Sequence, residues 1–126
     1  MSPMRAGGVE LLAGVTVDLT FGPVLAVGIG GIWVETYRDV ALRLLPVDPG
    51  TVEAMLAELK GAALLRGAHG GQTVDVKQVV DAVIGLTDAA RALGPTLEAL
   101  EVNPLWCSSD RVEALDVRVV TKQEEV

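Results

Sequence analysis

Two oxygen-bearing side chains near the end of the chain, Asn103 and Asp116, could together hold a divalent cation. Glu101 and Asn103 alternate with Leu100 and Val102, so in a β-strand the polar pair lies on one face and the apolar pair on the other. Asp116 follows in a second alternating segment, residues 112–119. Carboxylate and amide oxygens are ligands of Mg²⁺, with water and phosphate oxygens filling its other positions. The chemistry they indicate is binding of a metal–phosphate ligand.

The small polar residues 107–110 separate the two segments and predict a hairpin turn. A hairpin folded about Ser109 and Asp110 places Asn103 directly across from Asp116, and such pairs have Cβ atoms about 4.5–5.5 Å apart. The same alternation places Arg118 beside Asp116. Carboxylates on one face of a hairpin are also typical of a solvated face. Asn and Asp are nevertheless poor strand formers, so their presence in two apolar strands needs a reason.

Composition limits the classes of function. The 126 residues suffice for one domain, and with half of them hydrophobic but only 3% aromatic, aliphatic residues must build the core. The net charge of −7 argues against a nucleic-acid partner. A single cysteine, Cys107, excludes an internal disulfide framework. No signal peptide and no apolar span of about 20 residues is visible, which predicts a cytoplasmic protein without a membrane partner.

Strands and turns are expected before the first helix. The predicted strands are residues 9–17, 23–28 and 32–45, the second of them central and buried on both faces. Turns are predicted at residues 18–23 and at the glycine cluster, residues 28–31.

Helix signals follow. Asp48 and Pro49 predict the start of a helix that ends near Gly61. Asp75 and Gln78 predict a capping box on a second helix, which ends at residues 94–95. With the strands already described and the hairpin, this order indicates an α+β fold, a mainly antiparallel sheet with two helices on one face.

Two other polar residues are weaker candidates. Arg43 stands between leucines, where alternation places it opposite the face of Val40 and Leu42. It is either a surface arginine or a contact to an anion. The single histidine, His69, lies in a second glycine loop without an orienting carboxylate that the sequence identifies.

Four segments together resemble the C-terminal half of the ATP-grasp domain of NDP-forming (ADP-forming) acyl-CoA synthetases, a domain type that also occurs in the succinyl-CoA synthetase β subunit. These segments are residues 8–11 with Asp18 and 21–23; residues 28–35 with Asp39, Arg43 and Pro46; residues 64–67; and residues 101–105 with 115–118. The resemblance covers roughly residues 8 to 119. It implies an ATP-grasp C-terminal lobe at residues 8–120, between a disordered leader, 1–7, and a charged tail, 121–126.

The resemblance also implies site residues and cofactors. Asn103 and Asp116 match the Mg²⁺ ligands, and Asn103 thereby contacts the bound ATP or ADP. Glu101 matches the glutamate that steadies a visiting phosphohistidine loop, and Arg43 could help to neutralise phosphate. The implied reaction converts acyl-CoA, ADP and phosphate to acid, CoA and ATP.

Within this resemblance the chain is a fragment or subunit of an acid–thiol ligase and is inactive alone. Its partners would be the missing ATP-grasp N-terminal lobe and a CoA-binding domain or subunit. The alternative is a non-catalytic protein-interaction or regulatory module derived from such a region, as in a protein acetyltransferase. That alternative predicts a homodimer or a bound partner, and no dependence on metal.

Overall fold

The computed structural model describes residues 8–29, 39–65 and 74–122. Its elements in chain order are β1 (Gly8–Asp18), β2 (Gly22–Ile29), β3 (Val40–Leu44), α2 (Pro49–Glu58), α3 (Ala62–Leu65), α4 (Val76–Leu93), η2 (Gly94–Thr96), β4 (Leu97–Ser108), β5 (Val112–Ala114) and β6 (Val117–Thr121). The predicted leader, residues 30–38 of the predicted glycine turn and long strand, His69 and the last four residues of the predicted tail fall outside the described ranges.

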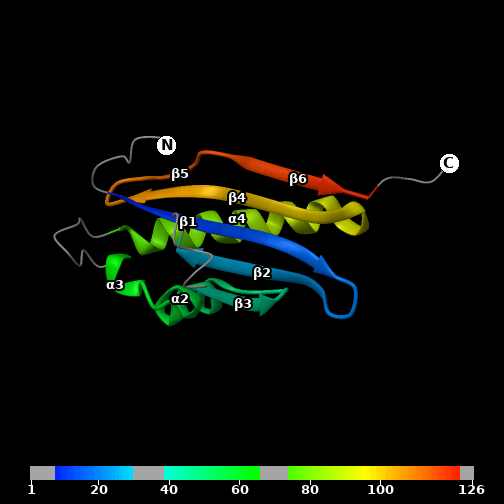
Figure 1. Cartoon of the computed structure of the whole chain (residues 1–126), viewed down its shortest axis with the longest axis horizontal. Coiled ribbons are helices and arrows are strands. Elements are labelled where there is room, and N and C mark those ends of the chain that lie inside the picture. The colour runs from blue at the N-terminus through cyan, green and yellow to red at the C-terminus, as the bar shows by residue number, and fades with distance from the viewer. Residues whose placement is uncertain (1–7, 30–38, 66–73, 123–126) are drawn as a thin grey trace.

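The strands form one antiparallel sheet in the order β3-β2-β1-β4-β5, and β6 also pairs with β4. Figure 1 shows α2 and α4 on the same side of this sheet, where α4 contacts β1 and β4 and α2 contacts β2 and β3. The predicted α+β fold, with two helices on one face of an antiparallel sheet, is confirmed. We call the other side of the sheet, which carries Gly14, Ala26, Leu42 and Glu101, the open face.

Strand alternation builds the core between the sheet and the helices. Leu11 and Val15 of β1 and Leu25 and Val27 of β2 all point to the helix side, and each is 0% exposed. Burying an aliphatic side chain of this kind contributes about 1.5–3 kcal/mol. The prediction that β2 is buried on both faces was wrong, because no helix covers the open face and Val24 and Ala26 there are only half-buried.

The helices begin where their caps predict. Asp48 accepts the Thr51 N–H at 2.7 Å and Pro49 is the first residue of α2. Asp75 accepts the Gln78 N–H at 3.3 Å at the start of α4. The reciprocal half of the capping box is absent, because the Gln78 side-chain amide donates to the Asp75 carboxylate instead. None of the helices in the described ranges is long and apolar enough to cross a bilayer.

The hairpin at the end of the chain has the predicted register but not the predicted regularity. Pairs Leu105–Ala114 and Val102–Val117 both agree with a turn centred between Ser109 and Asp110. The second arm is nevertheless broken into β5 and β6 at residues 115–116. Pro104 has no N–H to donate, so here it only accepts, and its carbonyl oxygen takes the Leu115 N–H at 3.0 Å.

A β-bulge in β4 accompanies this break. Against β1 the register shifts between the pair Leu11–Leu105 and the pair Ala13–Val102, so two residues of β4, Asn103 and Pro104, stand opposite Leu12. Strict alternation is therefore lost at this point. Beyond the bulge Leu105 is the residue that returns to the helix side, where it is 5% exposed.

Candidate functional site

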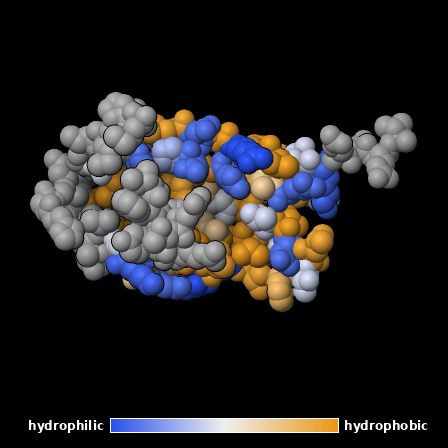
Figure 2. Space-filling model, viewed as in Figure 1, coloured by the Kyte–Doolittle hydropathy of each residue, from blue (hydrophilic) through white to orange (hydrophobic). Residues whose placement is uncertain are grey.

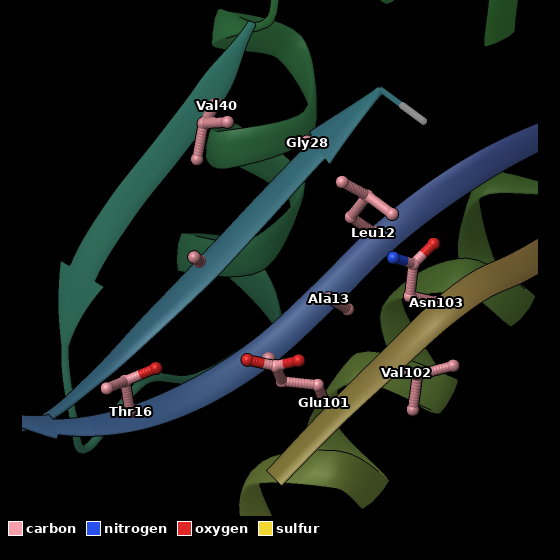
Figure 3. Close-up of a pocket in the computed structure, with 10 residues that line it drawn as sticks. Leu12, Ala13, Thr16, Gly28, Val40, Glu101, Val102 and Asn103 are labelled. Carbon is pink, nitrogen blue, oxygen red and sulfur yellow. The ribbon is translucent and has the colours of Figure 1, made fainter. Parts of the chain in front are cut away.

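A groove crosses the open face over β1, β2 and β4, and it contains two of the predicted site residues (Figure 3). Glu101 and Asn103 line it from β4. Small residues make part of its floor, namely the Gly14–Ala26 pair across β1 and β2 and Gly28, which pairs with Leu12. The groove has a volume of about 230 Å³. Pockets that enclose a small molecule usually measure about 300–1,000 Å³, so this groove alone is too small to enclose a nucleotide.

Glu101 lies across the adjacent strand because the residue opposite it is glycine. Gly14 pairs with Glu101 between β1 and β4. A Cβ atom at Gly14 would lie 3.2 Å from the Leu100 carbonyl oxygen and 3.3 Å from Glu101 Cγ. Figure 3 shows the Glu101 carboxylate extended over β1 toward the groove. Even an alanine at residue 14 would push on this side chain.

The structure brings the backbones of Asn103 and Asp116 together, as the hairpin predicts. The Asn103 N–H donates to the Asp116 carbonyl oxygen at 3.0 Å, and both residues are exposed to solvent. Asp116 sits in the break between β5 and β6, directly across from the bulge that carries Asn103. Bulges are over-represented beside active sites, because they re-aim a side chain.

The donor set suits a hard cation that keeps other ligands. An amide oxygen and a carboxylate are the oxygen ligands that Mg²⁺ accepts, and the ion usually takes only one or two protein carboxylates alongside water and phosphate. Among the described residues, no group of three or more His, Cys, Asp or Glu could hold a metal ion by itself. The donor types of Asn103 and Asp116 therefore suit a Mg²⁺ ion whose other ligands are water and phosphate.

Arg43 does not lie with these residues. It pairs with Leu25 across β2 and β3, which places it on the helix side of the sheet. Its guanidinium forms a salt bridge with Glu58 of α2 at 2.5 Å. This hydrogen bond lowers the pKa of Glu58 and raises that of Arg43. Arg43, the predicted anion contact, therefore lies on the opposite face of the sheet from Glu101 and Asn103.

Cys107 is not a candidate nucleophile. It is 0% exposed, and burial raises the pKa of its thiol to about 12. The thiolate is the reactive form of cysteine, so this residue serves packing.

Sequence reasoning missed one residue that shapes the site, Gly14, and the cross-strand partner of another, Arg118. Gly14, inside an apolar strand, is the kind of glycine that marks close approach of a neighbour. Arg118 pairs directly with Glu101 across β4 and β6. The sequence places Arg118 two residues after Asp116, whereas its position opposite Glu101 follows from the register of β4 and β6.

Known proteins resemble nearly the whole chain. A family model described as an ATP-grasp domain matches residues 1–121. The β subunit of acetate–CoA ligase [ADP-forming] II from Pyrococcus furiosus is 29% identical over 97% of this chain and 52% of the relative. The β subunit of acetate–CoA ligase [ADP-forming] I from the same organism is 31% identical over 90% of this chain and 48% of the relative. The chain thus spans about half the length of these curated relatives.

A solved structure agrees with this likeness. The acetyl-coenzyme A synthetase 1 of Ca. Korarchaeum cryptofilum, in complex with coenzyme A and Mg-AMPPCP, superposes with a TM-score of 0.85. It is 30% identical, and the match covers 97% of this chain and 55% of that one. In that structure a phosphohistidine segment points toward the nucleotide-binding site.

Proposed function

Because the chain belongs to the ATP-grasp domain family, we propose that it supplies the C-terminal half of a Mg-nucleotide site in an ADP-forming acyl-CoA synthetase. The observation that carries the proposal is the hairpin register. It sets Asn103 across from Asp116, at the end of a groove that Glu101 lines. The reaction would convert acyl-CoA, ADP and phosphate to acid, CoA and ATP.

Each residue has a role that its position supports. Asn103 and Asp116 would each give one oxygen to Mg²⁺, which when bound would neutralise charge on the phosphate oxygens. Glu101 would accept a hydrogen bond from the imidazole N–H of a phosphohistidine and so hold the ring in place, as carboxylates orient histidines elsewhere. Positioning and charge neutralisation dominate catalysis of phosphoryl transfer.

The site is half of a larger one. The groove measures about 230 Å³, and two oxygens leave most of the six positions around Mg²⁺ to other ligands. The chain spans about half the length of its curated relatives. We therefore assign the rest of the nucleotide pocket to an ATP-grasp N-terminal lobe, and CoA to a further domain or subunit. The chain alone would bind Mg-ADP weakly and catalyse nothing.

Titration calorimetry with Mg-ADP tests this proposal. The wild type and the double variant Asn103→Ala/Asp116→Ala are compared in the presence of a complementing N-terminal lobe. We expect the double variant to lose most of the heat that depends on Mg²⁺. Arg43→Gln is the matched control, because Arg43 lies on the other side of the sheet and should leave the heat unchanged. Equal heats for wild type and double variant would refute the metal assignment.

A second candidate function has its own supporting observation. Leu19 at 102%, Phe21 at 67% and Leu42 at 58% are large exposed apolar residues that line one hollow together. Figure 2 shows apolar surface gathered near the β1–β2 turn. Exposed patches of this kind tend to mark contacts between proteins. A non-catalytic module would form a homodimer or bind a partner without Mg²⁺, which sedimentation with and without the ion would detect.

A further inference from the structure

A second hollow lies beside the groove, on the far side of Glu101. It has a volume of about 350 Å³, and Thr16 and Glu101 border both spaces. Its charged lining is Glu98, Glu101, Arg118 and Lys122, and Ala99 contributes to its apolar part. No role described so far uses this hollow.

Among the residues that the structure describes, Arg118 is the cationic residue nearest along the hairpin to Asn103 and Asp116. It pairs directly with Glu101 between β6 and β4, so both side chains project from the open face. It is two residues from Asp116, a span of about 7 Å in extended chain. A phosphate group coordinated at Asp116 would therefore lie within reach of the long Arg118 side chain.

Arg118 differs from Arg43 and Arg111, whose guanidinium groups already form salt bridges. Arg43 is bound to Glu58, and Arg111 is bound to Glu113 at 2.9 Å. Within the described ranges, no salt bridge joins Arg118 or Lys122 to a carboxylate. Arg118 is exposed and its guanidinium remains available to a ligand.

The exposed guanidinium group of Arg118 favours an oxyanion as the ligand. A guanidinium matches phosphate oxygens with two parallel hydrogen bonds, which an ammonium group cannot do. Glu98 and Glu101 balance the two cations of the hollow, so an anion binds more tightly when another hydrogen-bond donor occupies the Glu101 carboxylate. That condition would couple phosphate binding here to what Glu101 contacts.

We propose that this hollow is a phosphate-oxyanion site with Arg118 as its main contact. The phosphate is either inorganic phosphate or the terminal phosphate of the nucleotide. The second source rests on the proposed function, whereas the first does not. The site supplies the positive charge that Arg43, on the helix side, does not bring to the open face.

Nuclear magnetic resonance of the arginine side chains in the full 126-residue chain tests this site. The Nε resonance that disappears in Arg118→Lys identifies Arg118. One titration uses inorganic phosphate with EDTA, and the other uses Mg-ADP. Movement of the Arg118 resonance with phosphate alone identifies inorganic phosphate as a ligand, and movement only with Mg-ADP identifies the nucleotide.

Variants of Arg118 and Glu101 should change the affinity for the anion by predictable amounts. Arg118→Gln should weaken binding of the effective anion at least about tenfold, the lower limit for loss of one charge-assisted hydrogen bond. Arg118→Lys should fall between Arg118→Gln and the wild type. The matched controls Arg43→Gln and Arg111→Gln remove the same charge elsewhere and should change binding less than about twofold. Glu101→Gln should strengthen binding of phosphate, because it removes a neighbouring negative charge without changing the size of the side chain.

The outcomes separate this inference from the proposed function. Failure of both anions to move the Arg118 resonance overturns the inference, and so does binding that Arg118→Gln leaves unchanged. If Asn103→Ala/Asp116→Ala leaves Mg-ADP binding unchanged while phosphate binding still requires Arg118, the metal assignment fails and the oxyanion site stands.

Discussion

Gly28 should be one of the least replaceable glycines in this fold, although its backbone conformation requires no glycine. It lies on the groove floor in β2, across from Val40 of β3. A Cβ atom there would lie 2.8 Å from the Asp39 carbonyl oxygen and 3.0 Å from Val40 Cγ2. Gly28→Ala therefore forces β2 and β3 apart at this end.

The neighbouring backbone has little room to move. The Asp39 carbonyl oxygen accepts the Ile29 N–H at 3.2 Å. The Asp39 carboxylate accepts the backbone N–H groups of Lys60 at 2.6 Å and Gly61 at 2.7 Å, and so fixes the chain after α2. Overpacking of this kind costs about 1–3 kcal/mol. We expect Gly28→Ala to lower the free energy of unfolding by that amount.

Gly85→Ala is the matched control, with the opposite sign. Gly85 lies inside α4, and a Cβ atom there would meet nothing within 4 Å. Alanine in a helix interior is about 1 kcal/mol more favourable than glycine, so this variant should be more stable than the wild type. The same change of residue thus separates the two variants by about 2–4 kcal/mol.

Urea unfolding followed by circular dichroism measures both variants. With a urea m-value of about 1–3 kcal/mol per molar, the two midpoints should differ by about 0.7–4 M. If Gly28→Ala is as stable as the wild type while Gly85→Ala gains stability, the close contact at Asp39 is not what the structure indicates, and the reasoning fails.

Two further predictions concern protons. Hydrogen bonds from the Thr51 N–H to Asp48 and from the Gln78 side chain to Asp75 lower the pKa of both capping carboxyl groups. The stabilisation that these caps give is therefore complete above the unfolded-state pKa of about 3.9. It is lost as the pH falls through the lower pKa values of the folded state. The urea midpoint of the wild type should fall on acidification. The double variant Asp48→Asn/Asp75→Asn, whose caps do not titrate, should show a flatter dependence of the midpoint on pH. Identical slopes of midpoint against pH for the two proteins would contradict this. The thiol of Cys107 has a pKa of about 12, so at about pH 8 roughly one thiol in ten thousand is ionised. It should therefore not react with a disulfide reagent at that pH until urea unfolds the chain. Rapid, stoichiometric labelling of the native protein would show that the thiol is not buried.

Local patterns were enough to predict most of the elements and one part of the site. Asp48 and Asp75 cap the two helices because capping depends on only a few residues of chain. The hairpin register follows from the turn, so the pairing of Asn103 with Asp116 could be read from the sequence. The metal and nucleotide roles of these residues remain proposals.

Tertiary structure decided what alternation leaves open. Alternation shows which residues share a face of a strand, but not which face the helices cover. Arg43 points to the helix side because α2 and α4 pack there, and the apolar Leu42 and Leu44 are consequently exposed on the open face. The bulge at Asn103 and Pro104 likewise depends on the pairing of β4 with β1, a strand almost ninety residues earlier in the chain. Contacts between elements so far apart in sequence arise from packing of the whole sheet, and short-range patterns carry no information about them.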